Sequence, residues 1–261
     1  MQGHYISLRK EGKVGVIEIN KPKANTYDHE MVLEFGRAID EVRFDDSIKV
    51  AVTTSKVPKF FSAGADIEML KGSEPDFKAM FCLNCQETLT KLESTPKVFI
   101  AALNGHTVGG GLEIALAHDL RFMIDDPKLQ IGLPEVNLGV LPGTGGTQRL
   151  PRLINKSIAL DMMITGRTLN PQEALHVGLV NYIYPADRFE PEWMAYAKRL
   201  AEGPARAVNL IKRSVQEGVE MTLTQGLALE RELQNRLFVT KDAKEGLAAF
   251  IEKRKAVFAG A

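Results

Sequence analysis

The chain has 261 residues, of which 44% are hydrophobic and 25% are charged, a composition typical of a globular protein. Its 33 basic and 33 acidic side chains give a net charge of zero, which argues against a protein that wraps nucleic acid, because such proteins usually carry a basic excess. The first ten residues contain no apolar signal segment, and no stretch approaches the roughly 18 consecutive apolar residues of a membrane span, so we expect a cytoplasmic protein.

The first half of the chain alternates predicted strands and helices. Alternating apolar residues predict a hairpin over 6–19, and Asp28 stands where a side chain would cap a helix over 29–44. The same patterns predict strands at 48–54, 97–103 and 119–124 and helices at 76–93 and 113–118. This rhythm of strand, connection and helix is typical of an α/β core with parallel crossovers.

The second half is mainly helical after one long loop. Residues 129–151 are rich in glycine and proline and are predicted to form a loop, and a loop of this length is usually functional. The helices predicted after it, interrupted by a short apolar run at 179–184, span 155–164, 171–177, 187–201, 204–217, 222–238 and 241–256. Gly203 and Pro204 mark the predicted boundary between a core at 1–202 and a helical unit at 203–261.

The cysteine and histidine residues indicate no redox or metal chemistry. Cys82 and Cys85 form a CxxC, but they lie inside a predicted helix and have no second ligand pair, which favours a reduced structural pair. His106, His118 and His176 lack the spacing of a metal site or a catalytic triad and are predicted to be structural. We therefore expect no metal.

Two glycine-rich turns are the most specific features, at 61–66 (FSAGAD) and 104–113 (NGHTVGGGLE). Neither fits a nucleotide-binding loop, and for each turn alone simple tight turning is an equal alternative. The second turn runs into an apolar helix, so amide N–H groups near Gly110 lack partners within the helix and favour negative charge. If the N–H of Ala65 faces the same point, the two donors form an oxyanion hole.

Two glutamates beside these turns are a candidate acid/base pair. Glu113 lies in the first helical turn, where glutamate commonly complements the helix dipole, and Glu135 lies in the long loop, where it could equally be a solvated charge. The helix start favours ionised Glu113, whereas apolar neighbours raise the pKa of Glu135, which would separate base from acid. Asp66 is predicted to cap the helix that follows the first turn.

Several segments resemble the crotonase (enoyl-CoA hydratase/isomerase) superfamily, in the same order and over nearly the whole chain. They are FFSAGADIEML, AALNGHTVGGGLEIALAHDLRF, GLPEVNLGVLPGTGGTQRLPR, ITGRTLNPQEALHVGLV and KDAKEGLAAFIEKRKAVF. The resemblance implies an α/β fold with a β-β-α spiral core and a C-terminal helical domain. It also implies a homo-oligomer, either a trimer or two stacked trimers, without a nucleic acid or membrane partner.

The resemblance also implies roles for particular residues. It assigns the oxyanion-hole amides to Ala65 and Gly110, and catalysis to Glu113 and Glu135. The presence of both glutamates favours a hydratase, because isomerases of the family commonly keep only the later one. The residues that it places against the acyl-CoA substrate, the last two from a neighbouring subunit, are Lys23, Ala24, Ala65, Asp66, Ile67, Glu68, Gly110, Phe250 and Lys253.

The expected reaction is syn addition of water to a 2-enoyl-CoA, a step of fatty acid metabolism. We assign activation of the water to Glu113 and donation of a proton to C2 to Glu135; the reverse assignment stays open, because two coupled carboxyls share their titration. CoA enters as part of the substrate, and no separate cofactor is expected. One alternative is isomerisation, hydrolysis or retro-aldol cleavage at the same site. Another is a non-catalytic scaffold that binds CoA or RNA, which the balanced charge and the two glutamates oppose.

The sequence also departs from the hydratase pattern. Leu112 stands where these hydratases carry cysteine, and Leu133 where they carry glutamine. Compared with the common pattern of these hydratases, the span from Glu113 to Glu135 is slightly longer, and the KPKAN segment is slightly shorter. These departures bear on which acyl chain the protein accepts more than on which class of reaction it catalyses. The candidate acyl-chain contacts are Phe77, Met80, Phe81 and Leu138.

Overall fold

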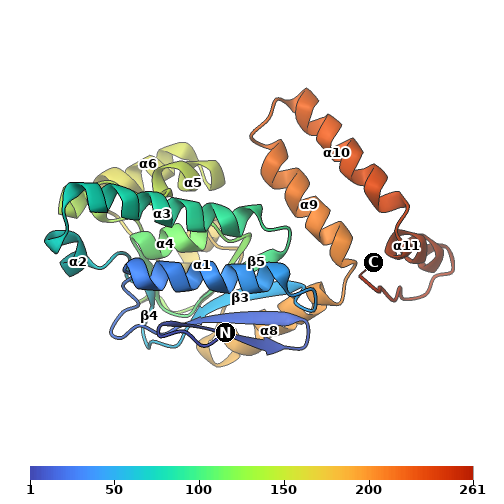
Figure 1. The fold of residues 1–261 in the computed structure, drawn as a ribbon, viewed down its shortest axis with the longest axis horizontal. Helices are drawn as coiled ribbons and strands as arrows, with labels where there is room; N and C mark the ends of the chain where they lie inside the picture. Colours follow the sequence, from blue (N-terminus) through green and yellow to red (C-terminus); the bar gives the residue numbers. More distant parts are fainter. Residues whose placement is uncertain (261) are drawn as a thin grey trace.

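A computed structural model describes residues 1–260 and contains a six-stranded sheet that forms the centre of the fold (Figure 1). Its strands, in spatial order, are β1 (Ile6–Glu11), β2 (Val14–Ile19), β3 (Val50–Ser55), β5 (Val98–Leu103), β7 (Leu120–Ile124) and β9 (Tyr182–Tyr184). The predicted hairpin pairs β1 with β2 in antiparallel register, and every later pair is parallel. The predicted α/β core with parallel crossovers is thereby confirmed.

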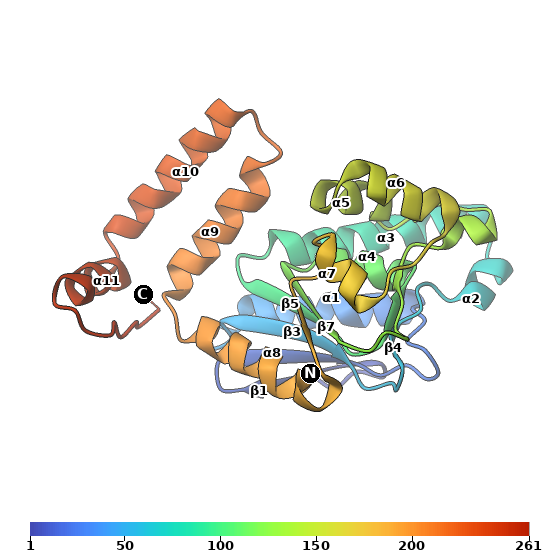
Figure 2. The same cartoon turned by 180° about the vertical axis from the view of Figure 1, so that it is seen from behind.

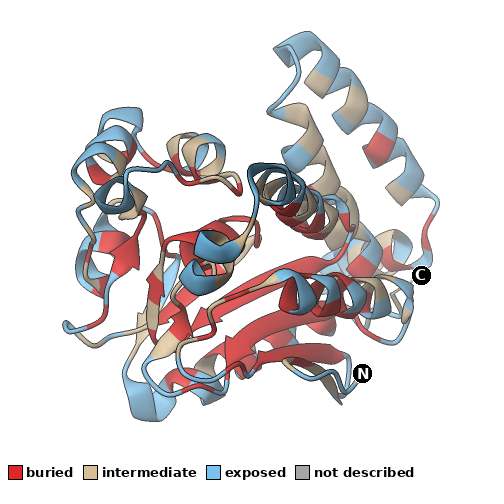
Figure 3. Ribbon diagram, turned by 60° about the vertical axis from the view of Figure 1, so that its left-hand side comes forward, coloured by how far each residue is buried: buried red, intermediate tan, exposed pale blue. Residues whose placement is uncertain are grey.

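Helices cover both faces of this sheet, which explains why its central strands are buried throughout. Every residue of β2, β3 and β5 is buried (Figure 3). Successive side chains of a strand point to opposite faces. In β5, Phe99 therefore packs towards α1 (His29–Phe44) and α3 (Pro75–Ser94), while Ile100 packs towards Trp193 of α8 (Ala186–Ala201).

A second sheet of three short parallel strands lies beside the first and was missed by the sequence analysis. Its strands, in spatial order, are β4 (Phe60–Ser62), β6 (His106–Val108) and β8 (Ile131–Gly132). Runs of two or three residues are too short to show a period of two. Because all three strands are parallel, their carboxyl ends lie at one edge of the sheet, and both glycine-rich turns leave from that edge.

The remaining helices were predicted, apart from two inside the segment 129–151. They are α2 (Ile67–Gly72), α4 (Gly110–Leu116), the 3-10 helix η1 (Glu135–Leu138), α5 (Gly146–Leu153), α6 (Lys156–Thr165), α7 (Pro171–His176), α9 (Ala205–Gly218), α10 (Leu223–Phe238) and α11 (Lys241–Ile251). Asp28 caps α1 by accepting from the N–H of Met31 at 3.0 Å, as predicted. Among residues 1–260, no helix is long and apolar enough to cross a membrane.

Two predictions about these elements were wrong. The predicted loop at 129–151 contains β8, η1 and α5; its glycines and Pro151 obscured a helix whose first residue follows Gly145 in a left-handed conformation, with φ of 115°. The last helix ends at Ile251 rather than near 256. Lys253 has a positive φ of 54°, and the N–H of Arg254 turns back to the carbonyl of Ala249 at 3.0 Å.

The cysteines and His118 are structural, as predicted. Cys82 and Cys85 are free thiols inside α3. His118 is buried between the carbonyl of Ile114, at 2.9 Å, and the hydroxyl of Thr53, at 2.7 Å. Burial lowers the pKa of His118 to about 3, so the ring is neutral and serves to join α4 to β3.

The C-terminal helices α9, α10 and α11 extend away from the two sheets (Figure 2). Lys212 attaches α9 to the core: its buried ammonium lies 2.9 Å from the carboxylate of Asp119 and 2.9 Å from the carbonyl of Lys97. The helix α10 packs on α9. The division at Gly203 and Pro204 stays a prediction, although α9 begins at Ala205.

Gly105, between β5 and β6, lies directly against the backbone of Lys59 and Phe60 at the start of β4. A substitution of Gly105 tests whether the fold depends on this close approach. A Cβ at Gly105 would lie 2.5 Å from backbone atoms of Lys59 and Phe60, where the N–H of His106 donates to the carbonyl of Lys59 at 2.7 Å. We expect Gly105→Ala to lower the free energy of unfolding by ~1–3 kcal/mol, the usual cost of overpacking, as measured by denaturant unfolding. Gly72→Ala is the matched control, since a Cβ there meets no atom within 4 Å. Equal stability of the two variants would contradict the expectation.

Candidate active site

The first glycine-rich turn follows β4 and contains Ala65. The residues on either side of Ala65 pair with the backbone of Tyr27. The N–H of Tyr27 donates to the carbonyl of Gly64, and the N–H of Asp66 donates to the carbonyl of Tyr27, both at 2.9 Å. These bonds flank Ala65 and turn its own N–H to the opposite side. Within residues 1–260 that N–H makes no hydrogen bond, so it is available to an external acceptor.

The second turn leaves β6 and places Gly110 at the start of α4. The N–H of Gly109 donates to the carbonyl of Gly132 at 2.9 Å, which ties the turn to β8. The N–H of Gly110 lies at the N-terminus of α4 and has no partner within the described chain. The two turns are in contact: a Cβ on Gly64 would lie 3.0 Å from the nitrogen of Gly110. Each side of the predicted oxyanion hole therefore offers an unused donor.

Glu113 lies one turn into α4 and is 2% exposed. Its Oε1 accepts the N–H groups of Thr144, at 2.8 Å, and Gly146, at 2.7 Å, and its Oε2 accepts the hydroxyl of Thr144. Burial raises the pKa of Glu113, and these three hydrogen bonds oppose the rise because they favour the charged form. The net shift of this pKa is upward, so the expectation that the helix start keeps Glu113 ionised is not met by the helix start alone; the three donors are what favour the charged form.

Glu135 is the first residue of η1 and has the opposite environment. Its Oε2 is buried and has no hydrogen-bond partner within residues 1–260. Its Oε1 lies beside the second turn, since a Cβ on Gly109 would be 3.3 Å from it. Burial, together with the negative charge of Glu113, raises the pKa of Glu135 to about 7. The predicted rise of this pKa is confirmed.

The residues predicted to contact CoA fall into two groups. Lys23 and Ala24 lie beside the first turn, where the carbonyl of Ala24 accepts the N–H of Ala63 at 3.0 Å. Asp66 caps α2 as predicted, by accepting from Met69 at 3.1 Å, and Ile67 and Glu68 are exposed on that helix. By contrast, Phe250 and Lys253 lie at the end of α11, which a single chain does not bring to the two turns (Figures 1 and 2).

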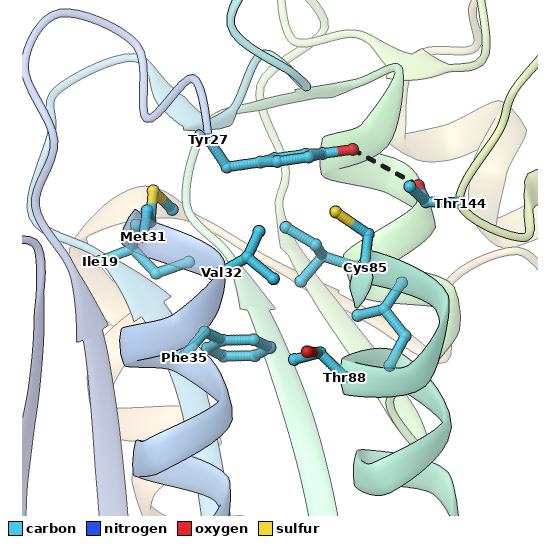
Figure 4. A pocket seen from close by; sticks show the side chains of 10 residues that line it. Ile19, Tyr27, Met31, Val32, Phe35, Cys85, Thr88 and Thr144 are labelled. Atoms are coloured by element: carbon cyan, nitrogen blue, oxygen red, sulfur yellow. Dashed lines mark hydrogen bonds between the residues drawn. The ribbon is translucent and has the colours of Figure 1, made fainter. Parts of the chain in front are cut away.

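The sequence analysis missed Tyr27 and Thr144, whose hydroxyl oxygens lie 3.4 Å apart (Figure 4). Tyr27 is 4% exposed, and its hydroxyl occupies the position that a Cβ on Gly110 would require. Below the two residues, a small apolar cavity of ≈ 20 Å³ lies between α1 and α3. The signal in the sequence was weak: a lone tyrosine before a helix cap, and a threonine between glycines.

The remaining acidic and sulfur side chains do not assemble a metal site. Among residues 1–260, no group of three or more histidine, cysteine, aspartate or glutamate side chains is placed to hold a metal ion. The described chain therefore supplies backbone N–H donors, the buried carboxyl group of Glu113 and the half-buried carboxyl group of Glu135 at one edge of a sheet. Such a site can stabilise a developing negative charge on oxygen and move a proton next to it.

Comparison with known proteins gives consistent similarities over the full chain. Residues 9–261 match the profile of the family described as enoyl-CoA hydratase/isomerase. The chain is 37% identical over 254 residues to a crotonyl-CoA hydratase of Syntrophomonas wolfei, covering 97% of each protein. It is 36% identical over 256 residues to a short-chain-enoyl-CoA hydratase of Clostridium acetobutylicum, covering 98% of this chain and 97% of that protein. A crystal structure of an enoyl-CoA hydratase from Geobacillus kaustophilus superposes with a TM-score of 0.97 at 53% identity, covering 100% of this chain and 98% of that one.

The environment of Glu135 predicts a carboxyl group that titrates near neutral pH. In protein labelled with ¹³C at the glutamate Cδ, we expect one resonance to titrate with a midpoint of about 7 and to be absent from Glu135→Gln. A midpoint near the ordinary 4.5 would contradict the described burial.

The same shift links pH to stability. Between pH 4.5 and about 7 the folded protein keeps a proton at Glu135 that the unfolded chain has released, so this group's contribution to stability falls as pH rises through that window. Glu135→Gln should remove that part of the pH dependence, measured as unfolding midpoints at pH 5 and pH 7.5.

Proposed function

Because the chain belongs to the enoyl-CoA hydratase/isomerase family, we propose that it is an enoyl-CoA hydratase that adds water to a 2-enoyl-CoA. The observation that carries the proposal is the placement of two glutamates, Glu113 buried and Glu135 with one buried oxygen, in opposed environments beside two unused amide donors. Relatives and a solved structure with hydratase names support the reaction class. The product is the 3-hydroxyacyl-CoA, and CoA enters only as part of the thioester.

In this proposal the thioester oxygen accepts the N–H groups of Ala65 and Gly110. Attack of water at C3 moves the electrons of the double bond towards the carbonyl, and the resulting enolate oxygen carries negative charge. Two fixed donors stabilise that charge more than they stabilise the neutral substrate oxygen, which lowers the barrier. Removal of one such donor typically costs ~10²–10³ in rate.

The two glutamates divide the proton transfers. Glu113, whose donors favour the charged form, accepts a proton from the attacking water while the C3–O bond forms. Glu135, kept partly protonated by burial near pH 7, donates its proton to C2 as the enolate collapses. Both groups lie at the same edge of the small sheet, so that water and proton reach the same face of the double bond, which is syn addition.

We also propose that the site is completed by a neighbouring subunit of a trimer or a pair of stacked trimers. Phe250 is 84% exposed at the end of α11, far from its own glycine-rich turns. Large exposed apolar side chains continue along the C-terminal helices, a pattern that favours burial against another chain. These side chains are Ile211, Val215, Val219, Leu223, Leu227, Phe238, Leu247 and Ile251.

Hydration of crotonyl-CoA, followed as loss of the enoyl-thioester absorbance, tests the reaction. We expect turnover by the native protein and a loss of at least ~10²-fold in kcat for Glu113→Gln and for Glu135→Gln, because each removes one proton transfer. The exposed Glu87 of α3 offers the matched control Glu87→Gln, which should behave as native.

Near-native turnover by Glu113→Gln would refute its assigned role. Conversion of a 3-enoyl-CoA without hydration of crotonyl-CoA would replace the hydratase with an isomerase at the same site.

A substitution of Phe250 tests whether a neighbouring subunit contributes to binding of the substrate. We expect Phe250→Ala to raise KM for crotonyl-CoA at least about tenfold, equivalent to ~1.4 kcal/mol of binding, with little change in kcat. Phe44→Ala is the control, since Phe44 is similarly exposed, at 79%, but lies at the end of α1. Light scattering should give a mass of three or six chains for all three proteins; a monomer with native KM would rule out the subunit contribution.

A further inference from the structure

The carboxylate of Glu113 is bonded so completely that only one acceptor position remains. A carboxylate oxygen has two lone pairs. Those of Oε1 are both taken, by the N–H groups of Thr144 at 2.8 Å and Gly146 at 2.7 Å. One lone pair of Oε2 accepts the Thr144 hydroxyl. A water molecule can therefore donate to Glu113 only through the remaining lone pair of Oε2.

The direction of the hydrogen bonds follows from the number of protons. An ionised carboxylate only accepts, so Thr144 must donate its single hydroxyl proton to Glu113. The contact at 3.4 Å between the hydroxyl oxygens of Thr144 and Tyr27 then requires Tyr27 to be the donor. Both side chains are buried, at 5% and 4% exposure, so bulk water does not compete for these positions.

Tyr27 is held where it can act as this donor. Its backbone pairs with Gly64 and Asp66 around Ala65, and its ring packs against Phe81 with the ring centres 6.1 Å apart. Burial, and then the charge of Glu113, raise the pKa of Tyr27 well above its usual value, so the phenol stays protonated. The same backbone pairing therefore positions Ala65 and aims the hydroxyl at Thr144.

We infer that Tyr27 and Thr144 are positioning residues that fix which oxygen, and which side of that oxygen, of Glu113 receives the proton of the attacking water. We call the series Tyr27–Thr144–Glu113 the hydroxyl relay. The inference rests on the proposed role of Glu113 in hydration. When the water O–H bond breaks and the Oε2–H bond forms, the Thr144 hydroxyl occupies the other side of Oε2, so the proton stays on the side that faces the substrate.

The relay also favours the ionised form of Glu113, because it ends in a hydrogen bond to the charge. The other titratable or charged groups around Glu113 are Cys82 and Cys85 of α3, Arg149 of α5 and Glu135 of η1. None of these is removed by a change at Thr144 or Tyr27. A shift in the titration of Glu113 in those variants would therefore report the loss of the relay itself.

Conservative variants separate the relay from simple space filling. Thr144→Val keeps the shape and the backbone N–H but removes the hydroxyl; we expect kcat to fall about ten- to a hundredfold with KM within about twofold, as for loss of a hydrogen bond to a charged group. The acidic limb of the kcat/KM profile should move to higher pH. Thr144→Ser, which restores a hydroxyl, should recover most of the activity.

Tyr27→Phe completes the test, with Tyr184→Phe of β9 as a matched loss of a phenol hydroxyl elsewhere. Tyr27→Phe should lower kcat severalfold and move the acidic limb in the same direction. Because Tyr27 acts through Thr144, the double variant should be no slower than Thr144→Val alone. The relay would be overturned if the losses of kcat in Tyr27→Phe and Thr144→Val multiplied in the double variant. It would also be overturned if the acidic limb of the kcat/KM profile did not move.

A readout without turnover distinguishes failure of the relay from failure of the proposed function. In glutamate-labelled protein, the ¹³C resonance of Glu113, assigned through Glu113→Gln, should titrate at higher pH in Thr144→Val and recover in Thr144→Ser. This holds whether or not crotonyl-CoA is hydrated. An unchanged titration in Thr144→Val would overturn the inference even if the native protein is an efficient hydratase.

Discussion

Parallel pairing of three very short strands is the constraint on which the active site depends. β4, β6 and β8 contribute few residues each, yet the register that places Thr107 beside Ile131 and Val108 beside Gly132 fixes where each chain segment leaves the sheet. Ala65 follows the first strand, Gly110 follows the second, and Glu135 follows the third. Because side chains alternate along a strand, a slip of one residue would reverse the groups that face the site.

The two glutamates show how one small region gives similar groups different chemistry. Both are removed from water, which by itself disfavours charge. Glu113 is surrounded by donors from the Gly-rich segment that leads into α5, whereas a carboxyl oxygen of Glu135 is buried without a donor in the described chain. The difference arises from the local backbone around each group, and not from the residue type or its position in the sequence.

The sequence predicted the long elements well and the short ones poorly. The helix over α1, with its Asp28 cap, and the buried strands β3 and β5 carry signals over several residues, and they formed where expected. The strands of the small sheet are too short for a periodic pattern, and α5 was hidden by Pro151. Tyr27 and Thr144 are 117 residues apart, so only the fold brings their hydroxyls together.

The packing of Tyr27 against Gly110 makes these two positions interdependent during evolution. The phenol hydroxyl occupies the volume that any side chain at 110 would need, so a substitution of Gly110 is blocked while tyrosine is present. Position 27 therefore has to change to a smaller side chain before position 110 can vary. A side chain at position 110 would then be reached only through two successive substitutions, in a fixed order.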